Sequence, residues 1–260
     1  MNHEDVVNKS GFPLQIALEN LIGREQKPVG WRVIYSEHQW KNSDTNESGF
    51  IDLVLELTGG VIVLVIECKR VYDSSWIFLN SKGELNDRKH TKAWVSNLVN
   101  EEFKRFNWCD ITVLPSSPEC EYSIVSGQDP KSKPMLERTA STLISSTEAF
   151  AKEQSKYFSR ARDKGLYFNV IVTTADLIIG EFHPKSISIS NGTINGAKFH
   201  EVPFLRFRKQ LQPHIETITK NSFDHSVLAK AKENSVFVVN SKHFTEFLNS
   251  FNVDNLHSIL

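Results

Sequence analysis

The sequence predicts a mixed α/β fold in which helices flank a central sheet. Two apolar runs folded around a Gly-Gly pair predict a β-hairpin at residues 49–70. Long stretches with helical apolar spacing at 84–106 and 134–158 predict helices, and the apolar run 167–175 predicts a further strand. Helices that alternate with strands along one chain are typical of a sheet covered by helices on its faces.

The first half of the chain is expected to form a helix, three strands and a second helix. These elements are predicted at residues 13–22, 31–37, 50–57, 61–69 and 84–106. Pro13 suits a first helical turn, and a stripe of apolar residues follows it. The helix at 84–106 is predicted because apolar side chains from Trp94 to Phe106 repeat at helical spacing.

The second half is expected to add strands around one more long helix. Short strands are predicted at 111–114 and 122–125, a helix at 134–158, strands at 167–175 and 176–182, further strands at 186–190, 202–207 and 236–239, and a closing helix at 241–251. Ser241 is a candidate N-cap of the closing helix. We interpret residues 1–182 as a core and residues 183–260 as a C-terminal α/β extension packed on it, within one continuous domain.

The composition excludes several classes of protein. No apolar run is long enough to span a membrane, and the first residues lack the pattern of a signal peptide, so we expect a cytoplasmic protein with no membrane partner. The three cysteines show no CxxC spacing, and the nine histidines form no HxH or HExxH pair, which argues against disulfides and zinc. A net charge of −1 is not that of a protein that coats nucleic acid.

Local basic segments remain as candidates for contacts with phosphates. They are the spaced basic run from Lys152 to Arg162, the segment from Arg206 to Lys209, and the cluster Arg88, Lys89, His90 and Lys92. For the first two, a solvated helix face and an edge strand are the simpler interpretations.

Charged residues lie on the best-defined strands of the chain. If Gly59 and Gly60 form a two-residue turn, Asp52 falls opposite Glu67, and Lys69 lies two residues further along the same face. Two opposed carboxylates repel each other, and a hard divalent cation removes that repulsion by taking both as ligands. A metal ion, a water that it holds and a lysine are the groups needed to hydrolyse a phosphodiester.

The spacing alone does not identify a site. The three charges could equally form an ion-pair network at a sheet edge. The same spacing also occurs at Asp87, Glu102 and Lys104. We expect that copy to lie on a helix, where Glu102 and Lys104 would point in different directions and could not share a site.

In its context, the first pattern resembles the PD-(D/E)XK nuclease superfamily, which has the restriction-endonuclease-like fold. The matching residues are Ile-Asp at 51–52 and Glu-Cys-Lys at 67–69, and the order helix, three strands, helix, strand also fits. The resemblance covers roughly residues 11–182. Residue 51 is Ile where the family name has Pro, which is a common departure.

The resemblance implies a metal-dependent nuclease, acting as an endonuclease or an exonuclease on DNA, with RNA not excluded. Mg²⁺, for which Mn²⁺ can substitute, would be held by Asp52, Glu67, the Cys68 carbonyl and Glu19 of the first helix, and Lys69 would position or activate the attacking water. A homodimer and a role in restriction or antiviral defence are expected by analogy. The alternative is a catalytically silent nucleic-acid-binding or interaction subunit of a multi-protein defence complex.

Overall fold

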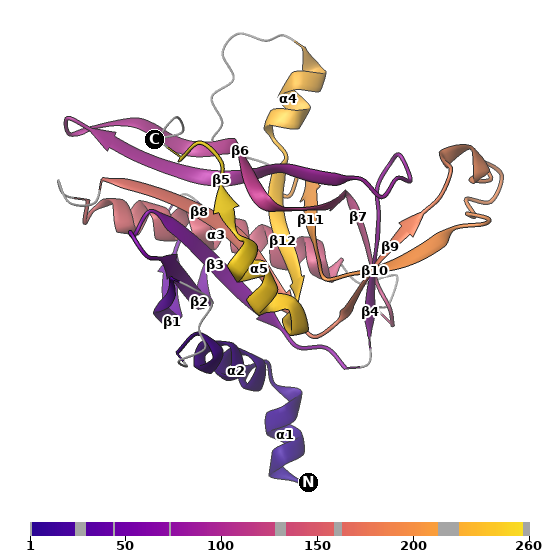
Figure 1. Ribbon diagram of the computed structural model, residues 1–260, viewed down its shortest axis with the longest axis horizontal. Coiled ribbons are helices and arrows are strands. Elements are labelled where there is room, and N and C mark those ends of the chain that lie inside the picture. Colours follow the sequence, from indigo (N-terminus) through magenta and orange to yellow (C-terminus); the bar gives the residue numbers. More distant parts are fainter. Residues whose placement is uncertain are drawn as a thin grey trace.

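The computed structural model describes residues 2–23, 30–43, 45–72, 74–127, 134–158, 163–212 and 224–256. Within these ranges the chain forms a mixed α/β structure, as the sequence predicts, with a large sheet, a smaller sheet and helices on both faces of the large one (Figure 1). No helix in this part of the chain is long and apolar enough to cross a membrane.

The large sheet begins with the predicted meander of three strands. β1 (Trp31–Lys41), β2 (Ser48–Leu57) and β3 (Ile62–Lys69) pair antiparallel in that order. β8 (Lys164–Thr173) lies beside β3 and runs parallel to it. A parallel pair needs a long crossover connection, and α3 (Met135–Ser155) lies within it. The strands predicted at 31–37, 50–57, 61–69 and 167–175 and the helix predicted at 134–158 are confirmed.

The C-terminal third contributes strands to the same sheet. β12 (Asn234–Asn240) pairs parallel with β8, and β11 (Phe204–Lys209) pairs antiparallel with β12. β11 also pairs with the end of β6 (Glu102–Cys120), which forms a long hairpin with β5 (Asp87–Val99). Because β5 also pairs with the first half of β8, the strands β8, β12, β11, β6 and β5 form a closed circuit.

Two apolar layers cover the two faces of the large sheet. On one face, α2 (Phe12–Gly23) and α5 (Phe244–Ser250) pack against β2, β3, β8 and β12. On the other face, α3 packs against the same strands (Figure 1). Leu53 and Leu55 belong to the first layer and Val54 to the second, as expected for side chains that alternate along a strand. Strands buried on both faces form nearly continuous apolar runs in the sequence.

The remaining elements are short. The smaller sheet has the order β10 (Lys198–Val202), β9 (Asp176–Glu181), β4 (Ser75–Leu79) and β7 (Tyr122–Val125). The other short elements are α1 (His3–Lys9), η1 (Pro184–Ser186), α4 (His225–Ala231), η2 (Ser241–His243) and β13 (Asn252–Val253). The predicted closing helix is η2 followed by α5, but its predicted N-cap is wrong. The side chain of Asn240, rather than that of Ser241, accepts a hydrogen bond from the Lys242 N–H at 2.9 Å.

The helix predicted at residues 84–106 is wrong, because this segment forms β5, a tight turn and the start of β6. Val99 pairs with Glu102, and Asn100 and Glu101 between them have positive φ angles of 52° and 65°. The centre of β5 is buried on both faces, so its apolar residues do not alternate strictly and imitate the helical period. An Asn-Glu pair is also a weaker hairpin signal than Asn-Gly.

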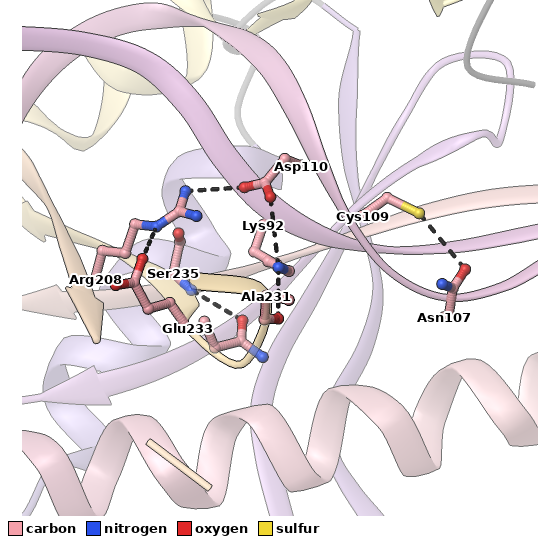
Figure 2. Close-up of polar contacts among 9 residues, drawn as sticks. Lys92, Asn107, Cys109, Asp110, Arg208, Ala231, Glu233 and Ser235 are labelled. Atoms are coloured by element: carbon pink, nitrogen blue, oxygen red, sulfur yellow. Dashed lines mark hydrogen bonds and ion pairs between the residues drawn. The ribbon is translucent and has the colours of Figure 1, made fainter. Parts of the chain in front are cut away.

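Two of the basic residues proposed for phosphate contacts are used inside the fold. The ammonium of Lys92 lies 3.4 Å from Asp110 and donates a hydrogen bond to the Ala231 carbonyl at 2.9 Å. Arg208 donates to the carboxylates of Asp110 and Glu233, each at 2.9 Å (Figure 2). These contacts tie the β5–β6 hairpin to β11 and to the chain that follows α4.

Arg206 also lies inside the fold, so the segment 206–209 is neither a basic surface nor an edge strand. Its guanidinium is fully buried and donates hydrogen bonds to the Ser117 hydroxyl and to the carbonyls of Val113 and Pro115. Burial lowers the pKa of Arg206 to about 10. β11 lies between β12 and β6, which makes it an interior strand.

Candidate functional site

The β2–β3 hairpin has the predicted register. Leu53 pairs with Ile66, as a turn at the Gly-Gly pair requires. The hydrogen-bonded turn lies one residue earlier than expected, because the N–H of Gly60 donates to the Leu57 carbonyl at 2.9 Å. Gly59 is required there, since its φ of 105° lies in a region that residues with a side chain rarely adopt.

Asp52 lies directly beyond the point where the β2–β3 pairing stops. The pairing extends to Leu53, one residue short of the predicted pair of Asp52 with Glu67. Past that point, Oδ2 of Asp52 accepts a hydrogen bond from the Cys68 N–H at 2.6 Å. The carbonyl of Asp52 accepts another from Nε2 of Gln15, on α2, at 3.0 Å. The Asp52 carboxylate therefore reaches towards the β3 backbone and is held there by defined contacts.

Glu67 and Lys69 form an ion pair at the end of β3. Oε1 of Glu67 lies 2.6 Å from Nζ of Lys69, and both side chains are partly exposed. Residues two apart on a strand share a face, so this contact follows from the strand itself. Asp52, Glu67 and Lys69 thus lie together at one end of the hairpin, and Lys69 supplies a positive charge beside both carboxylates.

The surroundings of Asp52 disfavour the ionised form of its carboxyl group. Burial and the nearby Glu67 carboxylate raise its pKa to about 7, and Glu37 adds a smaller effect in the same direction. The Cys68 N–H and the Lys69 ammonium lower the pKa, but by less. The fold alone therefore leaves the negative charge at this end of the hairpin incompletely compensated.

Glu37, on β1, is a site residue that the sequence analysis missed. Its neighbours Ser36 and His38 pair with Leu53 and Ile51, which places Glu37 across from Asp52. Its φ is 53°, a left-handed conformation that is uncommon for a residue other than Gly, Asn or Asp. The cross-strand register could have found it, but only if the register shift in β1 between Val33 and Tyr35 were known.

Glu19 lies on α2, close to β1. Leu18 and Ile22 bury the helix face that packs on the sheet, and Glu19 lies partly exposed at the border of that face. Its carboxylate accepts a hydrogen bond from the Ser36 hydroxyl at 3.1 Å. This contact ties Glu19 to β1, and it involves none of Asp52, Glu67 and Lys69.

The side chain of Cys68 takes no part in this group. It is buried in the layer that contains α2 and α5, and burial raises the pKa of its thiol well above the ordinary value. The thiol therefore behaves as an apolar core group. The carbonyl of Cys68 lies near Gly11, just before α2, and only this oxygen remains a candidate ligand.

The donors at this end of the hairpin suit a hard cation. Carboxylate oxygens and a backbone carbonyl are the ligands that Mg²⁺ accepts, and surplus negative charge favours its binding. Their present arrangement is not closed around an ion, since no group of three or more His, Cys, Asp or Glu side chains in the described ranges is arranged to hold a metal. The ion pair of Glu67 with Lys69 occupies one of the oxygens that a metal would use.

The second copy of the motif, at Asp87, Glu102 and Lys104, does not form a site, but the reason differs from the one that the sequence predicts. Glu102 and Lys104 lie on a strand, share a face and form an ion pair at 3.6 Å. The expectation that they point apart is therefore wrong. Asp87, however, lies at the opposite end of β5 from Val99, the partner of Glu102, roughly 40 Å away at the rise of a β-strand. Asp87 therefore cannot share a site with Glu102 and Lys104.

Comparison of the chain with protein-family models, with curated proteins and with solved structures found no match.

Proposed function

We propose that this protein is a metal-dependent nuclease with a restriction-endonuclease-like fold that hydrolyses phosphodiester bonds of DNA. The observation that carries the proposal is the end of the β2–β3 hairpin, where Asp52 and Glu67 share a single lysine and the Asp52 pKa rises to about 7. A role in restriction or antiviral defence, and a homodimer for cutting both strands, remain predictions by analogy.

The order of elements supports this proposal. α2, β1, β2, β3, α3 and β8 follow one another as helix, three strands, helix and strand, with β4 to β7 inserted before α3. The order expected from the resemblance is thus kept only when these four strands are set aside, with α3 in the place of the second helix. The motif residues lie on β2 and β3, at the open end of their hairpin, in a sheet that is covered by α2 on one face and by α3 on the other.

The chain's own residues would divide the chemistry between them. Asp52, Glu67 and the Cys68 carbonyl would hold Mg²⁺, with Glu19 as a further ligand. The ion supplies an activated water and stabilises charge on the phosphate. An ion bound by Glu67 would compete with Lys69 for the same oxygens, which would release the ammonium to face the developing negative charge. Gln15 and the Cys68 N–H hold Asp52 in place.

The test is cleavage of labelled plasmid, linear duplex, single-stranded DNA and RNA with Mg²⁺, Mn²⁺ or a chelator. We expect metal-dependent hydrolysis that falls by about three orders of magnitude or more in Glu67→Ala, because a ligand on the shared face is lost. Glu102→Ala is a matched control, since Glu102 also forms an ion pair with a lysine two residues later on a strand.

Glu102→Ala should cleave at the wild-type rate. Full activity in Glu67→Ala, or loss of activity in Glu102→Ala alone, would show that the wrong copy of the motif had been chosen. Absence of hydrolysis on every substrate with either metal would favour the catalytically silent subunit instead.

A further inference from the structure

A hollow of about 580 Å³ lies between the end of β1 and the end of α3. It is lined by Gln39, Trp40, Lys41, Asn42, Ser43, Ala149, Lys152, Glu153 and Lys156. Three of these residues are lysines and one is acidic. The hollow is therefore locally positive on a chain whose net charge is −1.

The single carboxylate of the hollow is already engaged. Oε2 of Glu153 lies 3.1 Å from Nε2 of His38. Lysines near a helix C-terminus favour the helix dipole, which accounts in part for Lys152 and Lys156. It does not account for Lys41, which comes from β1 and faces the same space. The Lys152 ammonium already lies over the Trp94 ring, 5.9 Å from its centroid, so a ligand with several negative charges would complement Lys41 and Lys156.

The hollow adjoins the candidate site through the β1–β2 pairing. Gln39, in its wall, pairs with Phe50 of β2. Phe50 lies two residues from Asp52, a distance of about 7 Å along a strand. The wall of the hollow is therefore two strand residues from Asp52, which is close enough for one polymer chain to contact both.

An exposed aromatic ring lies beside the hollow. Tyr157, which follows Lys156 at the end of α3, is 73% exposed. Proteins that bind single-stranded nucleic acid combine a positive groove with aromatic side chains on which bases stack. Stacked bases inside a duplex do not offer their faces to such rings, so this combination favours a single strand.

We propose that the hollow binds a single strand of nucleic acid, with its phosphates at Lys41 and Lys156 and a base against Tyr157. The inference deepens the proposed function, on which it rests, by naming the substrate form that is delivered to Asp52. Glu153 and His38 hold the end of α3 against β1 and so maintain the shape of the groove.

The test is fluorescence anisotropy with labelled oligothymidine, oligouridine and a duplex of equal length, in chelator so that nothing is cleaved. We expect tighter binding of the single strands than of the duplex. Lys41→Gln/Lys156→Gln should weaken single-strand binding about tenfold and reduce the slope of log K against log[salt] by about 1.4, or roughly 0.7 for each lost phosphate contact. Tyr157→Ala should weaken binding about tenfold with an unchanged slope, because stacking releases no counterions.

Lys185→Gln/Lys198→Gln is the control, since it removes two exposed lysines near the β9–β10 hairpin. It should bind like the wild type.

Equal losses in the two double variants, duplex binding as tight as single-strand binding, or no single-strand binding by the wild type would overturn the inference. Metal-dependent cleavage that is unaffected by Lys41→Gln/Lys156→Gln, with binding also unaffected, would leave the proposed nuclease standing without this groove. Groove-dependent binding without any cleavage would refute the nuclease alone.

Discussion

Two charged clusters in the large sheet differ in how their charges are balanced. In the cluster shared by β5, β6 and β11, two cations meet two anions, and Asp110 lies between Lys92 and Arg208 (Figure 2). Burial alone lowers the pKa of Arg208, but the attraction of Asp110 and Glu233 more than offsets it and raises the pKa above its usual value. The network stabilises the charged state of its own members.

The cluster at the end of the β2–β3 hairpin has the opposite character. Asp52 and Glu67 share one cation, Lys69, and Glu37 adds a further negative charge. Burial and repulsion raise the Asp52 pKa to about 7, so the site opposes the charged state of its own carboxyl.

The comparison separates charge that serves the fold from charge that is available for chemistry. A balanced network needs no further partner, and removing one member leaves another unpaired. A cluster with surplus carboxylates is stabilised when a cation binds to it, which is the property of a binding site. The variants below test this distinction, from the largest expected effect to the smallest.

The largest effect is expected for Lys69→Met. It should lower the rate of phosphodiester hydrolysis about 10²- to 10³-fold, because a positive charge beside the developing negative charge is lost. Metal affinity, measured by calorimetric titration, should remain close to that of the wild type. Lys104→Met, in the matched strand pair with Glu102, should change neither quantity. Lost metal affinity with unchanged turnover per bound metal would assign Lys69 to metal binding instead.

A smaller effect on stability is expected for Lys92→Met. Its side chain is 3% exposed, and loss of the ammonium leaves the Ala231 carbonyl without this donor. The free energy of unfolding in urea should fall by about 1–3 kcal/mol. Lys242→Met, which removes an exposed ion pair with Asp176, should cost less than about 1 kcal/mol. Cleavage per folded molecule should be unchanged by Lys92→Met. If this variant lost cleavage while remaining folded, the cluster of Lys92 would not serve the fold alone.

Asp52→Asn should make the metal-free protein more stable. The folded-state pKa is raised, so ionisation of Asp52 destabilises the fold above pH 7, and this penalty disappears as the pH falls towards the unfolded pKa of about 4. In chelator at pH 8, Asp52→Asn should exceed the wild type by about 1–2 kcal/mol, since the amide oxygen can still accept from the Cys68 N–H.

Thermal unfolding across pH tests this sign. The advantage of Asp52→Asn should shrink between pH 8 and pH 4, and Mg²⁺ should stabilise only the wild type. A variant that is less stable than the wild type at pH 8 would mean that the carboxylate is already compensated.

The smallest effect is expected for Glu19→Gln. If Glu19 completes the metal site, activity at limiting Mg²⁺ should fall a few-fold, and excess Mg²⁺ or Mn²⁺ should restore it. Stability should change little, because the residue is partly exposed and the amide oxygen can accept from Ser36. Glu201→Gln, on β10, is an exposed control that should show no metal dependence. An unchanged metal requirement in Glu19→Gln would remove Glu19 from the site.

Local patterning was sufficient for the elements whose periods are clear. The Gly-Gly turn set the register of β2 and β3, and α2 and α3 follow from apolar stripes of helical period. The grouping of Asp52, Glu67 and Lys69 follows from the same register, because residues of paired strands have fixed neighbours. Contacts within a hairpin or a helix depend on residues close in sequence, so the sequence could predict them.

Packing between distant segments decided the rest. β5 is buried on both faces, so its sequence lacks strand alternation, and only the pairing with β6 and β8 makes it a strand. Arg206 and Lys92 look like surface cations in the sequence, yet the closed circuit of strands buries them among distant carbonyls and carboxylates. Glu37 lies across from Asp52 because the register of β1 on β2 shifts between Val33 and Tyr35. These placements depend on partners far away in the chain, and no short stretch of sequence contains that information.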